Sequence, residues 1–116
     1  MALKVEMVTV DCSDPAELAG WWAEQIDGKT RELIPGEFVA VSRSGGPTLG
    51  FQKVPDPTPG KNRVHLDFLA DDVDGEVKRL VAAGAKEVGK HSFGPEFGWV
   101  VLEDPAGNAF CVAGKP

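Results

Sequence analysis

His65 and Asp67 are the two residues whose types and spacing point most directly to chemistry. Polar and apolar residues alternate over positions 64–68, which predicts a strand with both polar side chains on one face. Imidazole titrates near neutral pH and a carboxylate can orient it, so the pair could serve as an acid/base or bind a small molecule. A solvent-exposed sheet face would carry the same pattern, and the two interpretations have similar weight.

A second polar strand face is predicted near the start of the chain. Alternation over residues 4–12 places Met7, Thr9 and Asp11 on one face and Cys12 on the other. The apolar face must cover a helix, so we expect Cys12 to be a small core residue. The opposite face is then free to line a cavity or to meet solvent.

Several further residues could contribute to a site. Cys111 could face a cavity as a soft ligand or be a buried structural cysteine, and Trp99 could form an aromatic wall or pack in the core. His91 falls in a predicted turn, where we expect it to be solvated. Lys61, Asn62 and Arg63 could meet an anionic group, although a charged loop is the more common role of such a trio.

Two helices are predicted, and each begins after an aspartate. Asp14 caps the first, which Gly28 ends in a left-handed conformation, while Asp71 or Asp72 caps the second, which Gly84 ends. The apolar stripe of the second helix comprises Val73, Val77, Leu80 and Val81. Strands are predicted over residues 4–12, 29–34, 38–42, 49–54, 63–69, 86–90, 99–103 and 109–113.

The predicted elements repeat after a proline-rich connector over residues 55–61. A shift of 58 positions brings Met7 onto His65 and Asp14 onto Asp72, so a strand precedes an Asp-capped helix in both copies. Half of the chain could not bury its own sheet, which indicates that the two copies form one domain. We therefore predict an α+β fold with a single domain over residues 1–116, built from two βαβββ modules over residues 3–54 and 61–114. The two modules form a curved mixed sheet around a small-molecule cavity, with the helices outside.

The composition excludes several classes of partner. The chain has 12 Lys+Arg and 18 Asp+Glu, hence a net charge of −6, which argues against nucleic acid and anionic membranes. No apolar run approaches the roughly 20 residues of a membrane-spanning helix, and the first residues do not form a signal peptide. With only two cysteines, we expect a reduced cytoplasmic protein.

Three ordered motifs resemble a known superfamily. They are Asp11-Cys12-Ser13-Asp14-Pro15 followed by Trp21-Trp22, the segment 61–67, and Asp104-Pro105-Ala106-Gly107-Asn108 followed by Phe110-Cys111-Val112. Together with the duplicated plan, they resemble the glyoxalase/bleomycin resistance/extradiol dioxygenase (vicinal oxygen chelate) superfamily, and most closely its small glyoxalase-like domain branch. The resemblance implies a ligand-binding cavity and a homodimer.

The resemblance also implies where a metal would bind. The family's ligand positions correspond to Met7, His65, Cys111 and either Gly50 or Gln52, of which only His65 is a standard ligand of the family. We therefore expect no metal and no other cofactor. Should a divalent metal bind, the expected ligands are His65, Cys111 and Gln52.

These arguments favour a protein that binds a small, partly aromatic organic molecule without a metal. The expected contacts are Met7, Thr9, Asp11, Gln52, His65, Asp67, Trp99 and Cys111. The alternative is a lyase, isomerase or dioxygenase-type enzyme that uses His65 either in a non-standard metal site or as an acid/base with Asp67. A third possibility is an accessory domain that only dimerises.

Overall fold

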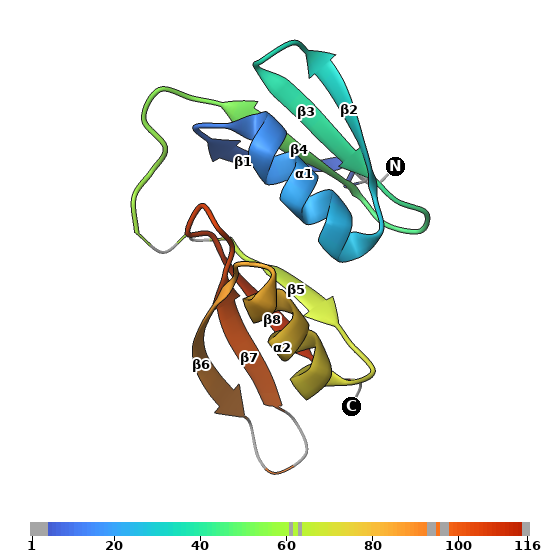
Figure 1. The fold of residues 1–116 in the computed structure, drawn as a ribbon, viewed down its shortest axis with the longest axis vertical. Helices are drawn as coiled ribbons and strands as arrows, with labels where there is room; N and C mark the ends of the chain where they lie inside the picture. The colour runs from blue at the N-terminus through green and yellow to red at the C-terminus, as the bar shows by residue number, and fades with distance from the viewer. Residues whose placement is uncertain (1–4, 61, 63, 93–94, 96–97, 115–116) are drawn as a thin grey trace. The chain divides into compact units, whose positions relative to one another are not determined.

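The chain folds into two compact units, divided between Thr58 and Pro59. The computed structural model describes residues 5–60, 62, 64–92, 95 and 98–114. Each unit holds one four-stranded mixed sheet and one helix (Figure 1), so the predicted α+β class with two βαβββ modules is confirmed. We refer to the units as the first and second modules.

Both modules arrange their strands in the same order. The first comprises β1 (Met7–Cys12), α1 (Pro15–Ile26), β2 (Lys29–Ile34), β3 (Phe38–Ser42) and β4 (Thr48–Lys53), with sheet order β1-β4-β3-β2. The second comprises β5 (Leu66–Leu69), α2 (Val73–Ala82), β6 (Lys86–Ser92), β7 (Gly98–Glu103) and β8 (Ala109–Ala113), with order β5-β8-β7-β6. The first and last strands of each module pair in parallel, and the other pairs are antiparallel. This shared topology agrees with the repeat found in the sequence.

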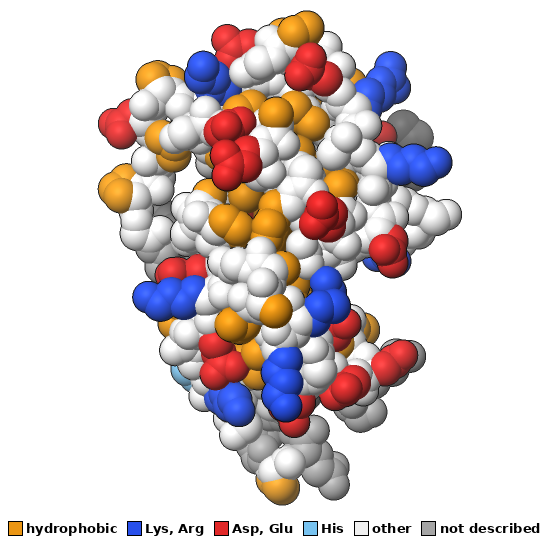
Figure 2. All heavy atoms as spheres, viewed as in Figure 1, with side chains coloured by type: hydrophobic (Ala, Val, Ile, Leu, Met, Phe, Trp, Pro, Cys, Tyr) orange, Lys and Arg blue, Asp and Glu red, His pale blue; other side chains and the backbone are white. Residues whose placement is uncertain are grey.

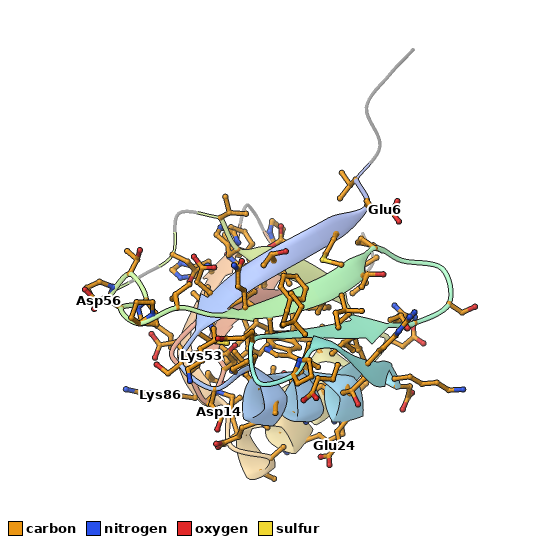
Figure 3. The ribbon with its side chains drawn as sticks, turned by 90° about the horizontal axis from the view of Figure 1, so that it is seen from above. Glu6, Asp14, Glu24, Lys53, Asp56 and Lys86 are labelled. Carbon is orange, nitrogen blue, oxygen red and sulfur yellow. The ribbon has the colours of Figure 1, made fainter. Side chains whose placement is uncertain are left out.

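Aspartate side chains begin both helices, as predicted. Asp14 Oδ1 accepts a hydrogen bond from the backbone N–H of Glu17 at 3.2 Å, and Asp72, not Asp71, accepts one from the N–H of Gly75 at 3.1 Å. Each carboxylate satisfies a backbone donor that the first helical turn leaves unpaired. Figure 3 shows α1 along one side of the first sheet, with Asp14 and Glu24 towards its two ends.

The prediction that Gly28 ends α1 in a left-handed conformation is wrong. Asp27 takes that role, with φ of 53°, and an aspartate tolerates this conformation better than most residues. Gly28 is needed for a different reason: a Cβ there would lie 2.7 Å from Val41 Cγ1 and 3.1 Å from the carbonyl oxygen of Ser42. The glycine therefore allows the chain leaving α1 to pass close to β3.

Each helix covers an apolar sheet face. In the first module, α1 packs on β2, β3 and β4, and the buried side chains there are Leu18, Ala19, Trp22, Val39, Val41, Leu49 and Phe51. In the second, α2 packs on β6 and β8, and the buried side chains are Val77, Leu80, Val100, Leu102, Phe110 and Val112. Cys12 is buried as predicted, whereas Val81, a member of the predicted apolar stripe of the second helix, is 43% exposed.

Strand boundaries match the predictions for β2, β3 and β8 and differ by a few residues elsewhere. The main correction concerns His91, which lies within β6 and not in a turn. Lys61 and Arg63, named in the sequence analysis, and residue 4, where the first strand was predicted to begin, lie outside the described residues. Within the described part of the chain, no helix is long and apolar enough to cross a membrane.

Candidate functional site

The sheet face opposite α1 carries the polar residues predicted for the first module. The β1–β4 register sets Thr9 beside Gly50 and Asp11 beside Gln52, away from the face that Leu49 and Phe51 turn to α1. We call this the α1-distal face. Thr9, Asp11 and Gln52 are exposed on it.

Gly50 lies where three side chains of this face converge. A Cβ built at Gly50 would lie 2.8 Å from Met7 Sδ, 3.0 Å from the Phe38 ring and 3.0 Å from Thr9 Oγ1. The space above the glycine is therefore already filled by a thioether, a ring and a hydroxyl. A side chain at position 50 would require these groups to move.

The second module brings together His65, Asp67 and Cys111. The β5–β8 register pairs Asp67 with Cys111, so both lie on the face opposite α2. His65 Nδ1 lies 3.4 Å from Asp67 Oδ1 and 3.8 Å from Cys111 Sγ. The His65 side chain is 40% exposed and that of Asp67 73%, whereas Cys111 is buried. The cluster is therefore anchored in the sheet at its sulfur and open to solvent at its carboxylate.

The same face extends to a stacked aromatic pair. Trp99 lies two residues from Val101, which pairs with Cys111, and Trp99 itself pairs with His91 of β6. The rings of His91 and Trp99 stack with centroids 5.6 Å apart and planes 27° apart. Leu69, Val101 and Ala113 occupy the positions between this stack and the His65–Asp67 pair. We call this surface the α2-distal face.

Asn62 and Asp104 fix the positions of these strands through hydrogen bonds that the sequence analysis did not predict. Asn62 donates hydrogen bonds from Nδ2 to the carbonyl oxygens of Val64 and Ala109, and its Oδ1 accepts one from the N–H of Ala109 at 2.7 Å. It thereby ties the segment before β5 to the start of β8. Its sequence signal was its place in the segment 61–67, three residues before His65; the bond to Ala109, 47 residues away, has no local signal.

Asp104 organises the turn that leads into β8. Its Oδ1 accepts hydrogen bonds from the backbone N–H groups of Ala106 and Asn108, both at 2.9 Å, and its two carboxylate oxygens also bind Nδ2 of Asn108. The carboxylate is buried and well satisfied, as a buried charge must be. The turn therefore fixes where β8 begins, and with it the position of Cys111.

A family model described as the glyoxalase-like domain matches residues 7–113. The chain belongs to this family. It is also 31% identical over 105 residues to a putative glyoxylase, CFP32, from Mycobacterium bovis, with 86% of this glyoxalase-like chain aligned. The alignment spans only 40% of the length of that relative, and an equally similar protein occurs in Mycobacterium tuberculosis.

Solved structures show the same fold. A glyoxalase/bleomycin resistance protein/dioxygenase family enzyme from Burkholderia phytofirmans matches with a TM-score of 0.82 at 20% identity, covering 97% of this chain and 98% of that one. A glyoxalase-related enzyme from Fulvimarina pelagi matches with a TM-score of 0.78 at 18% identity, covering 99% and 90%. A lactoylglutathione lyase from Agrobacterium tumefaciens matches with 0.72 at 18% identity, covering 98% and 95%. The glyoxalase-like domain thus has the fold of this superfamily.

Only some of the metal-ligand positions implied by the family resemblance hold a side chain with a good donor atom. In the first module, Gly50 has no side chain and Met7 offers a thioether, which suits soft ions and not the harder divalent metals. In the second module, His65 and Cys111 carry good donor atoms, and Asp67 lies beside both. The residues therefore do not fit a four-ligand set drawn from both modules. They offer instead three donors within one module. Asp67 is the third donor there, whereas the sequence analysis named Gln52 as the third ligand.

Proposed function

We propose that this glyoxalase-like domain binds a small, partly aromatic organic molecule on the α2-distal face. Trp99 and His91 would contact its ring system, and His65 and Asp67 would form hydrogen bonds with its polar groups. The observation that carries the proposal is the occurrence of an aromatic stack and a half-exposed polar pair on the same sheet face. All of these contacts come from protein side chains, so binding of this kind needs no metal.

The spacing of these groups limits the size of the molecule. Trp99 of β7 and Leu69 of β5 both pair with Ala113 of β8, so Trp99 lies two strands away from Leu69. Asp67 lies two residues before Leu69 on β5. With strands about 4.8 Å apart and about 3.3 Å per residue, the Cα atoms of Trp99 and Asp67 lie roughly 12 Å apart. The apolar floor between them is Leu69, Val101 and Ala113. A molecule of two or three fused rings with a polar substituent matches this length and composition.

The charge of the protein favours a neutral or cationic ligand. The chain carries a net charge of −6, and Asp67 is a largely exposed carboxylate at the polar end of the proposed site. Figure 2, which shows the side of each module that carries its helix, has the described Lys and Arg side chains interspersed with Asp and Glu. The exposed residues Thr9, Asp11 and Gln52, with Met7, stay predicted ligand contacts of the first module.

Isothermal titration of the purified protein with acridine orange, a planar cation, and with bleomycin tests this proposal. Trp99→Leu removes the aromatic contact, and Trp21→Leu on α1 is the matched control because Trp21 lies in the first module, where its ring meets that of Trp22 edge-on. An aromatic contact contributes about 0.5–1.5 kcal/mol, so Trp99→Leu should weaken binding about 2- to 13-fold and Trp21→Leu should leave it unchanged. The proposal is refuted if neither probe shows saturable binding, or if both variants lose the same affinity for the probe that binds.

A further inference from the structure

Strand β2, at the edge of the first sheet, carries two basic side chains on the face that α1 leaves uncovered. Arg31 pairs with Ala40 of β3, which in turn pairs with Gly50 of β4. Gly50 belongs to the α1-distal face, so Arg31 lies on that face too. Lys29 lies two residues before Arg31 on the same strand and hence on the same face, with about 6.7 Å between their Cα atoms. Both side chains are exposed.

The two basic side chains are not neutralised within the described part of the chain. Neither Lys29 nor Arg31 forms an ion pair with a described acidic side chain. Glu32 pairs with a buried residue of β3 and therefore lies on the face that α1 covers. Asp27 belongs to the C-terminal cap of α1, and Asp11 lies on β1, three strands and roughly 14 Å away. The β2 side of the α1-distal face is therefore positively charged, in a chain whose net charge is −6.

An aromatic ring lies next to this basic pair. Phe38 precedes Ala40 by two residues on β3 and shares its face, which makes it a diagonal neighbour of Arg31 at about 7–8 Å between Cα atoms. The Phe38 ring reaches over Gly50, where a Cβ would lie 3.0 Å from Phe38 Cζ. The ring is half-buried, so part of it faces solvent. Ala40 and Gly50 carry no long side chain, and the surface between the ring and the guanidinium is therefore low.

These groups are complementary to a planar organic anion. A guanidinium binds a carboxylate through two parallel hydrogen bonds, and an ammonium group adds a second positive charge. The exposed part of Phe38 offers an aromatic contact in offset or edge-to-face geometry. The Cα atoms of Gly50, beneath the ring, and of Arg31 lie two strands apart, roughly 10 Å. The Arg31 side chain extends into this interval, so one or two fused rings with a carboxylate substituent span the rest.

We propose that the β2 side of the α1-distal face binds a planar aromatic carboxylate, with Arg31 on the carboxylate, Lys29 as a second positive charge and Phe38 on the ring. The net charge of −6 opposes anions at long range. Charges farther away than a Debye length of about 8 Å are largely screened at physiological salt, so the local pair of cations prevails. This surface shares no residue with the α2-distal face, and the proposal is therefore independent of the function proposed above.

Titration calorimetry of the purified protein with naphthoate tests the site, and the neutral naphthol is the matched probe without the charge. We expect saturable binding of naphthoate that is at least about 10-fold tighter than binding of naphthol, because hydrogen bonds to charged groups are the stronger ones. Raising NaCl from about 0.05 M to about 0.5 M should weaken binding of naphthoate and leave binding of naphthol unchanged, since salt screens only the charged contact.

The first sheet offers a matched control for the charge variants. Lys53, labelled in Figure 3, pairs with the buried Cys12 and so lies on the opposite face of the same sheet. Arg31→Gln should weaken naphthoate binding about 10-fold and Lys29→Gln about 2- to 5-fold, whereas Lys53→Gln should leave it unchanged. Phe38→Leu should weaken it about 2- to 13-fold by removing the aromatic contact. The three basic side chains are exposed, so their variants are expected to fold normally.

Three results would overturn the proposal: no saturable binding of naphthoate, equal affinity for naphthoate and naphthol, or equal losses of affinity in Arg31→Gln and Lys53→Gln. Trp99→Leu should leave naphthoate binding intact, and Arg31→Gln should not weaken binding of acridine orange. Failure of this proposal and failure of the proposed function are therefore separately visible.

Discussion

Replacing Asp104 with alanine is expected to lower the free energy of unfolding by about 2–4 kcal/mol. The substitution removes the acceptor of the backbone N–H groups of Ala106 and Asn108, both held at 2.9 Å. A donor left without its partner costs about 1–3 kcal/mol, which gives about 2–6 kcal/mol for two. Ala106 is exposed, so water replaces part of the loss and the lower half of that range applies.

Asp104→Asn separates the two roles of the carboxylate. The amide retains one oxygen for the two backbone donors, but its NH2 group takes the place of Oδ2, which now accepts from Asn108 Nδ2 at 3.0 Å. We expect a smaller loss of about 1 kcal/mol. Asp56→Ala, at an exposed aspartate in the connector, is the control and should change stability by less than about 0.5 kcal/mol.

Urea denaturation followed by far-ultraviolet circular dichroism measures these differences, with thermal melts as a second readout. In a chain of this size, 1 kcal/mol corresponds to roughly 4 °C in Tm, so Asp104→Ala should melt about 8–16 °C lower. A loss below 0.5 kcal/mol for Asp104→Ala, or one no larger than that of Asp56→Ala, would show that the carboxylate does not organise the turn.

Two further substitutions test other contacts. Gly28→Ala forces a Cβ to within 2.7 Å of Val41 Cγ1 and 3.1 Å of the Ser42 oxygen, so it should cost about 1–3 kcal/mol in urea denaturation; an unchanged midpoint would contradict the close approach. The hydrogen bonds from Arg79 hold the pKa of Glu76 below its ordinary value of 4.5, so the charged Glu76 stabilises the fold above that pH and the contribution disappears as pH falls through the lowered pKa. Glu76→Gln should therefore cost about 0.3–0.5 kcal/mol at pH 7 and nothing near pH 2, and a difference that persists in acid would contradict this origin.

Alternating side chains made much of the fold and half of the site predictable. Period-two alternation fixes which residues share a strand face, so Asp67 was assigned to the opposite side of its strand from Leu66 and Phe68, whereas Cys111 was left open between a cavity-facing and a buried position. Local capping chemistry likewise identified Asp14 and, as one of two choices, Asp72. These signals lie within a few residues of the features that they predict.

Contacts between distant segments could not be read from the sequence. Asn62 bonds to Ala109, 47 residues away, and the requirement for Gly28 arises from β3, so neither of these contacts has a local signal. His91 was assigned to a turn because its stacking partner Trp99 lies on the opposite strand of a hairpin. The pairing of His65 with Asp67 was predicted from spacing, whereas the approach of Cys111 to His65 required the β5–β8 register.

The strand order has a consequence for how the protein is synthesised. In each module, the strand made first can pair only with the strand made last: Met7 of β1 pairs with Thr48 of β4, and Leu66 of β5 with Phe110 of β8. Until β8 leaves the ribosome, β5 has no partner within its sheet and β7 lacks one of its two neighbours. Closing a loop of some forty residues is slow compared with forming a hairpin. The nascent chain therefore exposes the first strand and the half-built sheet while each module is translated, β1 in the first module and β5 in the second. Chaperones or aggregation compete with folding during this interval.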